Sequence, residues 1–369
     1  MLSASLSSSA SPAPGVSISW REGVYIESAE GPGVWCDAAH RRELCFVSSA
    51  QVLKALRLPD SLLCSERSFR LYAGLHDAAK TPGSALLSPT GRPFQLGPLR
   101  LELFPSGAMP GSASLWLRSA GGVEVVYAGA PNPAQRTTAD PMQVRAAQHL
   151  IIHAPLAATD AVLPSREQAL LALRAHLAQA QHDGQACVIL CPALSTAPEL
   201  IHALRSEVAA SHAEQPLSLL AHAQILQACT AYRRVGALPD HLPMSAPPLR
   251  RFAGTLPPGS TLFWPLGASL EPLASLQAAS PKRVILCSAV ALLPAVLSAL
   301  QAQLAAQGLA SAQPVPFPDA LDRSGLVRYV RDTGCRHVYL TAGACADLAD
   351  ALAPVVCEAL GPPSQLRLF

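Results

Sequence analysis

The side chains that could hold a metal ion are scattered in this sequence. It contains 11 histidines, but no two stand in the His-x-His spacing by which one loop offers two imidazoles to the same ion. His149 and His153 lie in an apolar stretch that is typical of a strand, where paired histidines are more often structural than metal-binding. A hydrolytic metal centre, which lowers the pKa of a bound water and clamps a phosphate oxygen, therefore has no evident ligand set.

Cysteine chemistry has equally little support. The ten cysteines include no Cys-x-x-Cys pair. Cys187 and Cys191 flank a predicted buried strand, so we interpret them as small core side chains. We expect reduced thiols in a cytoplasmic protein rather than a disulfide framework.

The fraction of charged residues and the net positive charge are both low for a protein that binds nucleic acid through the phosphate groups. Only 14% of the residues are charged, and the formal net charge is +2, so we expect direct nucleic-acid binding to be weak. Basic pairs, which we interpret as solvated loop ends unless the fold gathers them, occur at Arg41-Arg42, Arg233-Arg234, Arg250-Arg251 and Lys282-Arg283.

Two segments invite a targeting or membrane interpretation that their composition does not favour. Residues 1–16 are rich in Ser, Ala and Pro but lack the basic start and long apolar core of a secretory signal, so we expect a disordered tail. The apolar run at 284–300 is interrupted by Pro294. We expect a buried strand (Arg283–Cys287) and then an amphipathic helix (Leu293–Gln307), with no association with a membrane.

A β-hairpin is predicted near the middle of the chain. Apolar side chains alternate over residues 115–127, which gives the hairpin one apolar face, and Gly121-Gly122 supplies the turn. The sequences at its two ends are Gly107-Ala108-Met109-Pro110-Gly111-Ser112 and Tyr127-Ala128-Gly129-Ala130.

These two turns resemble those of metallo-β-lactamase-fold nucleases of the β-CASP type. That group includes RNA 3′-end-processing endonucleases and bacterial exonucleases associated with DNA ligase. Its members have Gly-His-x-x-Gly-Ser before the hairpin and Tyr-x-Gly-Asp after it, whereas Ala108 and Ala130 replace the metal-binding histidine and aspartate here. The resemblance implies an α/β fold: a metallo-β-lactamase αββα sandwich with an inserted β-CASP-like α/β subdomain.

Other motifs of the family can be placed in the same order, also without their ligands. Ser48 matches the serine of Ser-His-x-His-x-Asp-His, and 318–322 matches Ser-Asp-His-x-Asp with Ala320 in place of the histidine. His153 stands where the family usually has an acidic residue. The positions at which the resemblance implies lost metal ligands are Ser49, Gln51, Leu53, Lys54, Ala108, Ala130 and Ala342.

Several consequences follow for the site. Two adjacent metal ions need imidazole and carboxylate ligands, so the resemblance implies no metal cofactor. We expect the former metal pocket to be filled by Leu53 and the alanines, with Lys54 as the only strong charge near it. Asp319 and Asp322 are interpreted as helix caps. Ser195-Thr196 replaces a Gly-Arg pair of the family, which argues against phosphate binding there.

The order of the motifs implies a division of the chain. Two strands are expected within 17–38, ending near Asp37, and a helix capped by Ser165 and Gln168 should end at Gly184. From about 215 to 311, strands alternate with helices, which predicts a parallel α/β layer. A last helix is expected over Ala344–Leu360. The expected segments are a tail (1–16), a metallo-β-lactamase-like part (17–165), a β-CASP-like subdomain (166–311), a return to the first domain (312–360) and a C-terminal tail (361–369).

The end of the chain is similar to a known type of binding peptide. Residues 365–369 read Gln-Leu-Arg-Leu-Phe, similar to the Gln-Leu-x-Leu-Phe pentapeptide by which bacterial repair and replication proteins bind the sliding clamp. Prolines before it would release it as an extended segment. The alternative is an apolar end that folds back on the core. The expected partner-binding residues are Gln365, Leu366, Leu368 and Phe369.

The resemblance implies a catalytically inactive protein that acts as an accessory or scaffold in bacterial DNA repair. Its expected partners are the sliding clamp, and DNA ligase or an active nuclease. Two alternatives stay open: an active exonuclease of this fold with a rearranged site, and an inactive subunit of an RNA 3′-end-processing complex.

Overall fold

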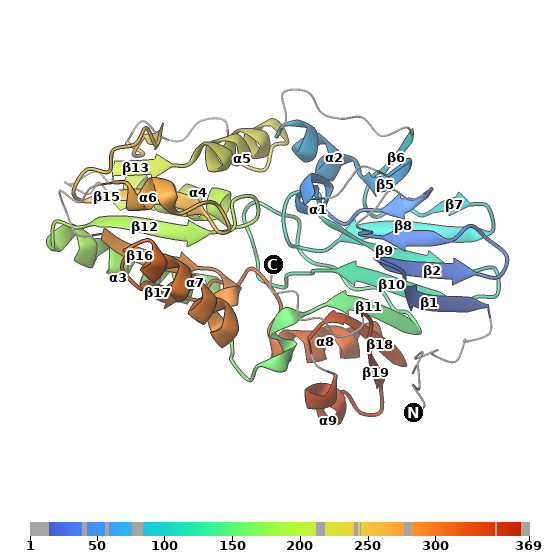
Figure 1. The fold of residues 1–369 in the computed structure, drawn as a ribbon. Helices are drawn as coiled ribbons and strands as arrows, with labels where there is room; N and C mark the ends of the chain where they lie inside the picture. Colours follow the sequence, from blue (N-terminus) through green and yellow to red (C-terminus); the bar gives the residue numbers. More distant parts are fainter. Residues whose placement is uncertain are drawn as a thin grey trace.

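The computed structural model describes residues 15–38, 43–55, 59–75, 84–211, 218–239, 243, 245–276, 282–343 and 345–362. Three β-sheets with helices on their faces form a mixed α/β fold with two lobes (Figure 1). One lobe contains the first two sheets, and the other contains the third.

The first sheet is built from the N-terminal part of the chain. Its strands, in chain order and in spatial order, are β1 (Val16–Trp20), β2 (Val24–Ser28), β3 (Val34–Cys36), β4 (Cys45–Phe46), β5 (Ser61–Ser65) and β6 (Ser84–Ser88). The strands from β1 to β3 are antiparallel, and those from β3 to β6 are parallel. Three strands therefore occupy the stretch where the sequence predicted two.

The second sheet contains the predicted hairpin, which is confirmed as β9 and β10, with Leu117 opposite Val125. The spatial order is β19-β18-β11-β10-β9-β8-β7, and the strands from β10 to β19 are parallel. The strands are β7 (Phe94–Leu96), β8 (Leu99–Pro105), β9 (Ala113–Arg118), β10 (Glu124–Gly129), β11 (His149–His153), β18 (His337–Ala342) and β19 (Val356–Ala359).

These two sheets pack face to face between layers of helices. Their facing side chains form one core, which includes Ile26 and Phe46 from the first sheet and Leu115 and Ile151 from the second. Helices α1 (Ala50–Ala55) and α2 (Glu66–Ala73) cover the outer face of the first sheet. The outer face of the second sheet is covered by α8 (Arg323–Thr333), α9 (Ala349–Leu352) and the short helices η1 (Pro155–Ala158) and η3 (Ala346–Leu348).

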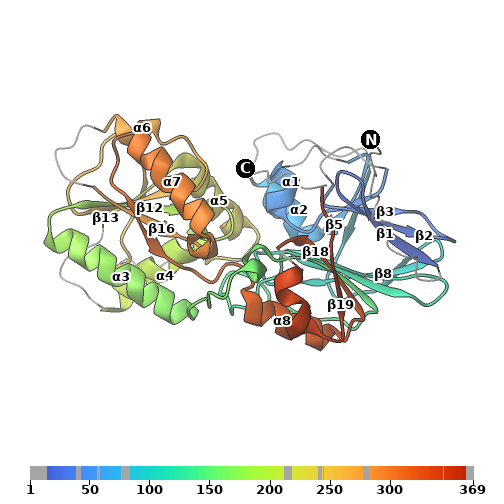
Figure 2. The same cartoon turned by 60° about the horizontal axis from the view of Figure 1, so that its bottom comes forward.

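The third sheet is entirely parallel, with the order β14-β13-β15-β12-β16-β17. Its central strands are continuous apolar runs because helices bury both faces. Figure 2 shows α3 and α4 on one side of it and α6 and α7 on the other. The strands are β12 (Ala186–Cys191), β13 (Ser218–Ala221), β14 (Leu249–Arg251), β15 (Ser260–Pro265), β16 (Lys282–Cys287) and β17 (Ala312–Val315). The helices are α3 (Arg166–His182), α4 (Ala197–Ser211), α5 (Ala223–Arg234), α6 (Glu271–Ala274), η2 (Ala289–Leu292) and α7 (Pro294–Ala306).

Local signals placed several of these elements correctly. Ser165 and Gln168 form the predicted capping box of α3, and Gly184 follows the helix with a positive φ of 62°. The apolar run near 284–300 is the predicted strand and helix, β16 and α7. Within the described ranges, no helix has the length and apolarity needed to cross a membrane.

Two expectations about the later chain are wrong. The third sheet extends to Val315, past the expected boundary at residue 311, because β17 pairs with β16. The single helix expected over 344–360 is instead a helical turn, α9, followed by the edge strand β19. Pro354 cannot continue a helix, and the β-branched pair Val355-Val356 that follows favours an extended chain.

The two lobes are joined by a buried ionic cluster. The Glu199 side chain on α4 has 0% exposure and meets Arg136, from the loop after β10, at 2.7 Å and Arg166 of α3 at 2.6 Å. Nearby, Tyr232 of α5 packs into the core beneath α1 and α2. The interface therefore combines apolar packing with buried charge.

Candidate functional site

A cavity of about 530 Å³ lies between the lobes. Its walls are formed where β3, β4, β10, β11 and β18 end in the first lobe and where β12, β16 and β17 end in the second. The carboxyl ends of parallel strands from all three sheets therefore converge here, which is the usual place for a ligand site in α/β proteins.

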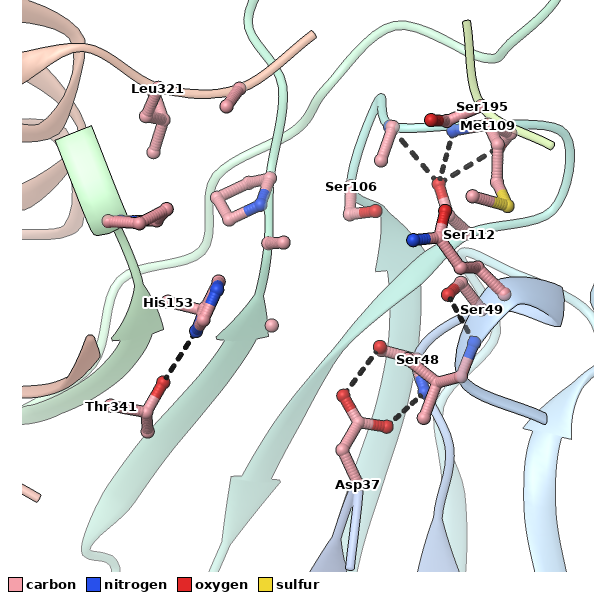
Figure 3. Close-up of a pocket in the computed structure, with 18 of the residues that line it drawn as sticks. Asp37, Ser48, Ser49, Ser106, Met109, Ser112, His153, Ser195, Leu321 and Thr341 are labelled. Carbon is pink, nitrogen blue, oxygen red and sulfur yellow. Dashed lines mark hydrogen bonds between the residues drawn. The ribbon is translucent and has the colours of Figure 1, made fainter. Parts of the chain in front are cut away.

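Asp37 forms the floor of the cavity on the first lobe (Figure 3). Its carboxylate accepts hydrogen bonds from the Ser48 backbone N–H at 2.8 Å, the Ser48 hydroxyl at 2.6 Å and the Tyr127 hydroxyl at 2.9 Å. Burial raises the pKa of the Asp37 carboxyl, and these hydrogen bonds oppose the rise. Asp37 thus ties β3 to β4 and β10, and both of its oxygens are engaged.

The turn between β8 and β9 forms the next part of the wall. The Ser112 hydroxyl accepts hydrogen bonds from the backbone N–H groups of Ala108 and Met109 at 3.1 and 3.0 Å. Gly107 and Gly111 have φ values of 79° and 74°, and a Cβ on either would lie within 2.4 Å of another backbone atom. The glycines and the serine are therefore needed to shape this turn, whatever the residue at 108 does.

His153 and Thr341 stand side by side on the opposite wall, at the ends of β11 and β18 (Figure 3). The His153 Nδ1 and the Thr341 hydroxyl are 3.3 Å apart. The His153 ring is accessible from the cavity, yet desolvation by the surrounding protein lowers its pKa. A neutral imidazole with one hydroxyl partner is therefore expected at neutral pH.

Asp319 belongs to the wall contributed by the second lobe. Its carboxylate accepts hydrogen bonds from the Thr196 hydroxyl at 2.7 Å, the Ser288 hydroxyl at 3.0 Å and the Ala289 backbone N–H at 2.8 Å. Burial raises its pKa, opposed by these bonds. The predicted capping role is therefore wrong for Asp319, which holds three loops together. It is confirmed for Asp322, which accepts from the Gly325 N–H and caps α8.

The structure brings some of the seven sequence-predicted positions together and separates the others. Ser49, Gln51, Ala108 and Ala130 line the cavity. The other three are not among its lining residues: Leu53, Lys54 and Ala342.

The expectation that Leu53 and the alanines would fill the pocket is wrong. Leu53 lies on the face of α1 that packs into the core under the first sheet, and Lys54 lies on the exposed face. An apolar side chain on a short amphipathic helix turns toward the core rather than toward a polar cavity. The cavity consequently remains, and the acidic side chains among its described lining residues are those of Asp37 and Asp319.

The cavity walls do not fit a pair of metal ions. Alanine at 108 and 130 has no donor atom, and the Asp37 carboxylate is engaged by Ser48 and Tyr127. Across the described part of the chain, no group of three or more His, Cys, Asp or Glu side chains is gathered as a metal site.

The described walls of the cavity also lack the groups that would stabilise the negative charge of a phosphate. No Lys or Arg is among the described residues that line the cavity. Of the cavity serines in the described chain, none is hydrogen-bonded to His153, whose side-chain partner is Thr341. The arrangement therefore offers hydroxyl groups, such as those of Ser49, Ser106 and Ser195, for hydrogen bonding to an uncharged polar ligand.

Sequence reasoning missed how this site is held together. Asp37 is bound by residues 11 and 90 positions away, and Asp319 meets Thr196 across 123 positions. No local pattern signals such contacts, although an Asp at the end of a strand was a partial cue. The predicted partner-binding residues Gln365, Leu366, Leu368 and Phe369 lie outside the described residues.

The fold and the site together define a mixed α/β protein with a largely uncharged cavity at the carboxyl ends of its parallel strands. No protein-family model matches the sequence, and a search of curated proteins finds no significant match.

Proposed function

We propose that this chain is a catalytically inactive homologue of the metallo-β-lactamase-fold β-CASP nucleases, which serves as an accessory or scaffold protein in bacterial DNA repair. The arrangement of the sheets supports the proposal. Two facing sheets lie between helical layers, and the third, parallel sheet is inserted between β11 and β18.

The observation that carries the proposal is the chemistry of the cavity walls. Ser49 and Gln51 at the start of α1, Ala108 between β8 and β9, and Ala130 after β10 lie around one cavity. Former ligands of one centre would be expected to lie in this way. A nuclease must offset the negative charge that develops on the phosphate, usually with metal ions or cationic side chains. The described cavity walls have neither metal ligands at these positions nor cationic side chains, which argues against cleavage there.

The direct experiment is elemental analysis of the purified protein together with a nuclease assay supplied with manganese or zinc. We expect no stoichiometric metal and no metal-dependent cleavage. Two metal ions per chain with metal-dependent cleavage would overturn the proposal and favour an active exonuclease with a rearranged site.

A second experiment tests the relationship to the nuclease family. The fourfold variant Ser49→His, Gln51→His, Ala108→His, Ala130→Asp places ligand side chains on the cavity wall. We expect it to retain zinc through dialysis, whereas the control Lys54→His, on the exposed face of α1, should not. A folded fourfold variant that binds no more zinc than this control would contradict the assignment of these positions.

A further inference from the structure

A second cavity, of about 400 Å³, lies within the second lobe between α4 and α5. Helix α4 contributes Ile201 and Arg205, spaced so that they share one face, and α5 contributes Leu226 and Arg233. Leu249 of β14 also lines the cavity. The lining of this basic cavity is therefore partly apolar and partly cationic.

Its positive charge is not neutralised within the described chain. Arg205, Arg233 and His202 line the basic cavity, and none of its described lining residues is a carboxylate. Arg205 and Arg233 make no ion pair with any described residue. Arg205 and Arg233 line the same cavity, and burial, followed by the charge of Arg233, lowers the pKa of Arg205.

The two arginines of the neighbouring helix α3, Arg166 and Arg174, are ion-paired, unlike Arg205 and Arg233. The carboxylates of α4 are directed to the arginines of α3: Glu199 meets Arg166, and Glu207 meets Arg174. The carboxylates on one side of α4 are therefore paired with arginines of α3, and the opposite side of α4 places cationic side chains in the basic cavity.

Arg205 is also held in place. Its Nε donates a hydrogen bond of 2.7 Å to the Pro247 carbonyl, which orients the guanidinium while its two terminal nitrogens have no described partner. Arg233 makes one long hydrogen bond, of 3.4 Å, to the Thr230 hydroxyl. Two guanidinium groups that converge without a counter-charge suit an anion with several acceptor oxygens.

We propose that the basic cavity binds an organic phosphate, with the phosphate group between Arg205 and Arg233 and the apolar part of the ligand against Ile201, Leu226 and Leu249. This proposal is independent of the function proposed above, because it concerns a different cavity. The same chemistry is offered by a free mononucleotide and by the phosphorylated end of a nucleic-acid strand.

The experiment measures binding to the full chain by calorimetry, with adenosine 5′-monophosphate, adenosine and inorganic phosphate as probes. We expect the monophosphate to bind more tightly than adenosine or inorganic phosphate. Arg233 is exposed, so Arg233→Gln should fold normally and weaken monophosphate binding about tenfold or more, since a charge-assisted hydrogen bond is lost. The matched control is Arg234→Gln, at the next position of the same helix end and outside the basic cavity, with an expected change of less than about twofold.

A further pair of probes identifies the source of the phosphate. A short oligonucleotide with a 5′-phosphate is compared with the same strand ending in a hydroxyl. Tighter binding of the phosphorylated strand, lost in Arg233→Gln, supports the proposal and assigns a strand end. If only the mononucleotide binds in this Arg233-dependent way, the proposal stands and the ligand is a free one. Equal affinity for the monophosphate and adenosine, equal losses in the two variants, or no binding of either phosphorylated probe at millimolar concentration would overturn it.

Discussion

Replacing Glu199 with glutamine should destabilise the protein more than any other single change to a charged residue of the lobe interface. The Glu199 carboxylate is fully buried and shared by two arginines. The Arg136 side chain is itself only 1% exposed, and its guanidinium also donates to the Ala108 carbonyl on the cavity turn. Glutamine keeps the shape of the side chain but removes the counter-charge.

The magnitude follows from what each arginine would lose. Arg136 would become a buried cation without a counter-charge, and breaking a buried ion pair in this way costs about 3–5 kcal/mol. The Arg166 side chain, 17% exposed, can turn partly to water, so Arg166→Gln leaves Glu199 with Arg136 and should cost only about 1–2 kcal/mol. For a chain of this length, the loss from Glu199→Gln corresponds to a fall in Tm of about 4–7 °C.

Urea unfolding followed by circular dichroism, with calorimetry for the Tm, measures these losses. The matched comparison is Glu199→Gln against Arg166→Gln. The double change Arg136→Met, Glu199→Leu should be less destabilising than Glu199→Gln alone, because it removes the fully buried Arg136 cation together with its counter-ion. If Glu199→Gln is no more destabilising than Arg166→Gln, or if the double change is the worst of the three, the reasoning is refuted.

Three further predictions concern the cavity and the tail. The raised pKa of Asp319 means that the folded state binds the carboxyl proton more tightly than the unfolded state does, so the stabilisation from this proton is present at low pH and is lost as pH rises through the folded pKa. Urea unfolding from pH 4 to pH 7 should therefore show that wild type loses stability relative to Asp319→Asn. A difference in unfolding free energy that stays constant over this range would contradict the prediction. Gly111→Ala should destabilise the protein by more than about 2 kcal/mol, because the positive φ is combined with a Cβ 2.4 Å from the Ser68 nitrogen. Gly184→Ala, which has a positive φ but open space around the Cβ, should cost only about 1 kcal/mol. Equal losses of stability in thermal unfolding of the two variants would contradict the steric argument. If the C-terminal pentapeptide is a clamp ligand, deleting residues 365–369 should abolish binding to the bacterial sliding clamp, with an affinity of the intact chain on the order of micromolar; equal binding by both chains, or none by the intact chain, would exclude this role.

Local patterns in the sequence were sufficient for the elements with strong internal signals. The alternation over 115–127 gave the hairpin, and the capping box of Ser165 and Gln168 gave the start of α3. Continuous apolar runs such as 186–191 gave the buried parallel strands. These features depend on neighbours within a few positions, so the chain itself contains the information.

The site could be predicted only in part, because its geometry depends on contacts between distant residues. Motif spacing placed Ala108 and Ala130 at one cavity, but it misplaced Leu53, whose direction is decided by the core under α1. The role of Asp319 depends on loops that follow two other strands of the third sheet. The prediction of a helix over 344–360 was wrong for a different reason. The alanine-rich composition around 344–353 favoured a helix and obscured the strand-forming residues that follow Pro354.

The ionic cluster at Glu199 also bears on how a ligand reaches the main cavity. Two-lobed proteins commonly admit ligands by hinge rotation, which requires an interface that can separate at low energetic cost. Rotation of the second lobe away from the first would pull Glu199 from Arg136 and leave a buried ion without its counter-ion. The entrance is therefore expected to have a nearly fixed width. Such a cleft selects its ligand by size at the mouth, and its rate of association should be insensitive to solvent viscosity beyond the effect on diffusion.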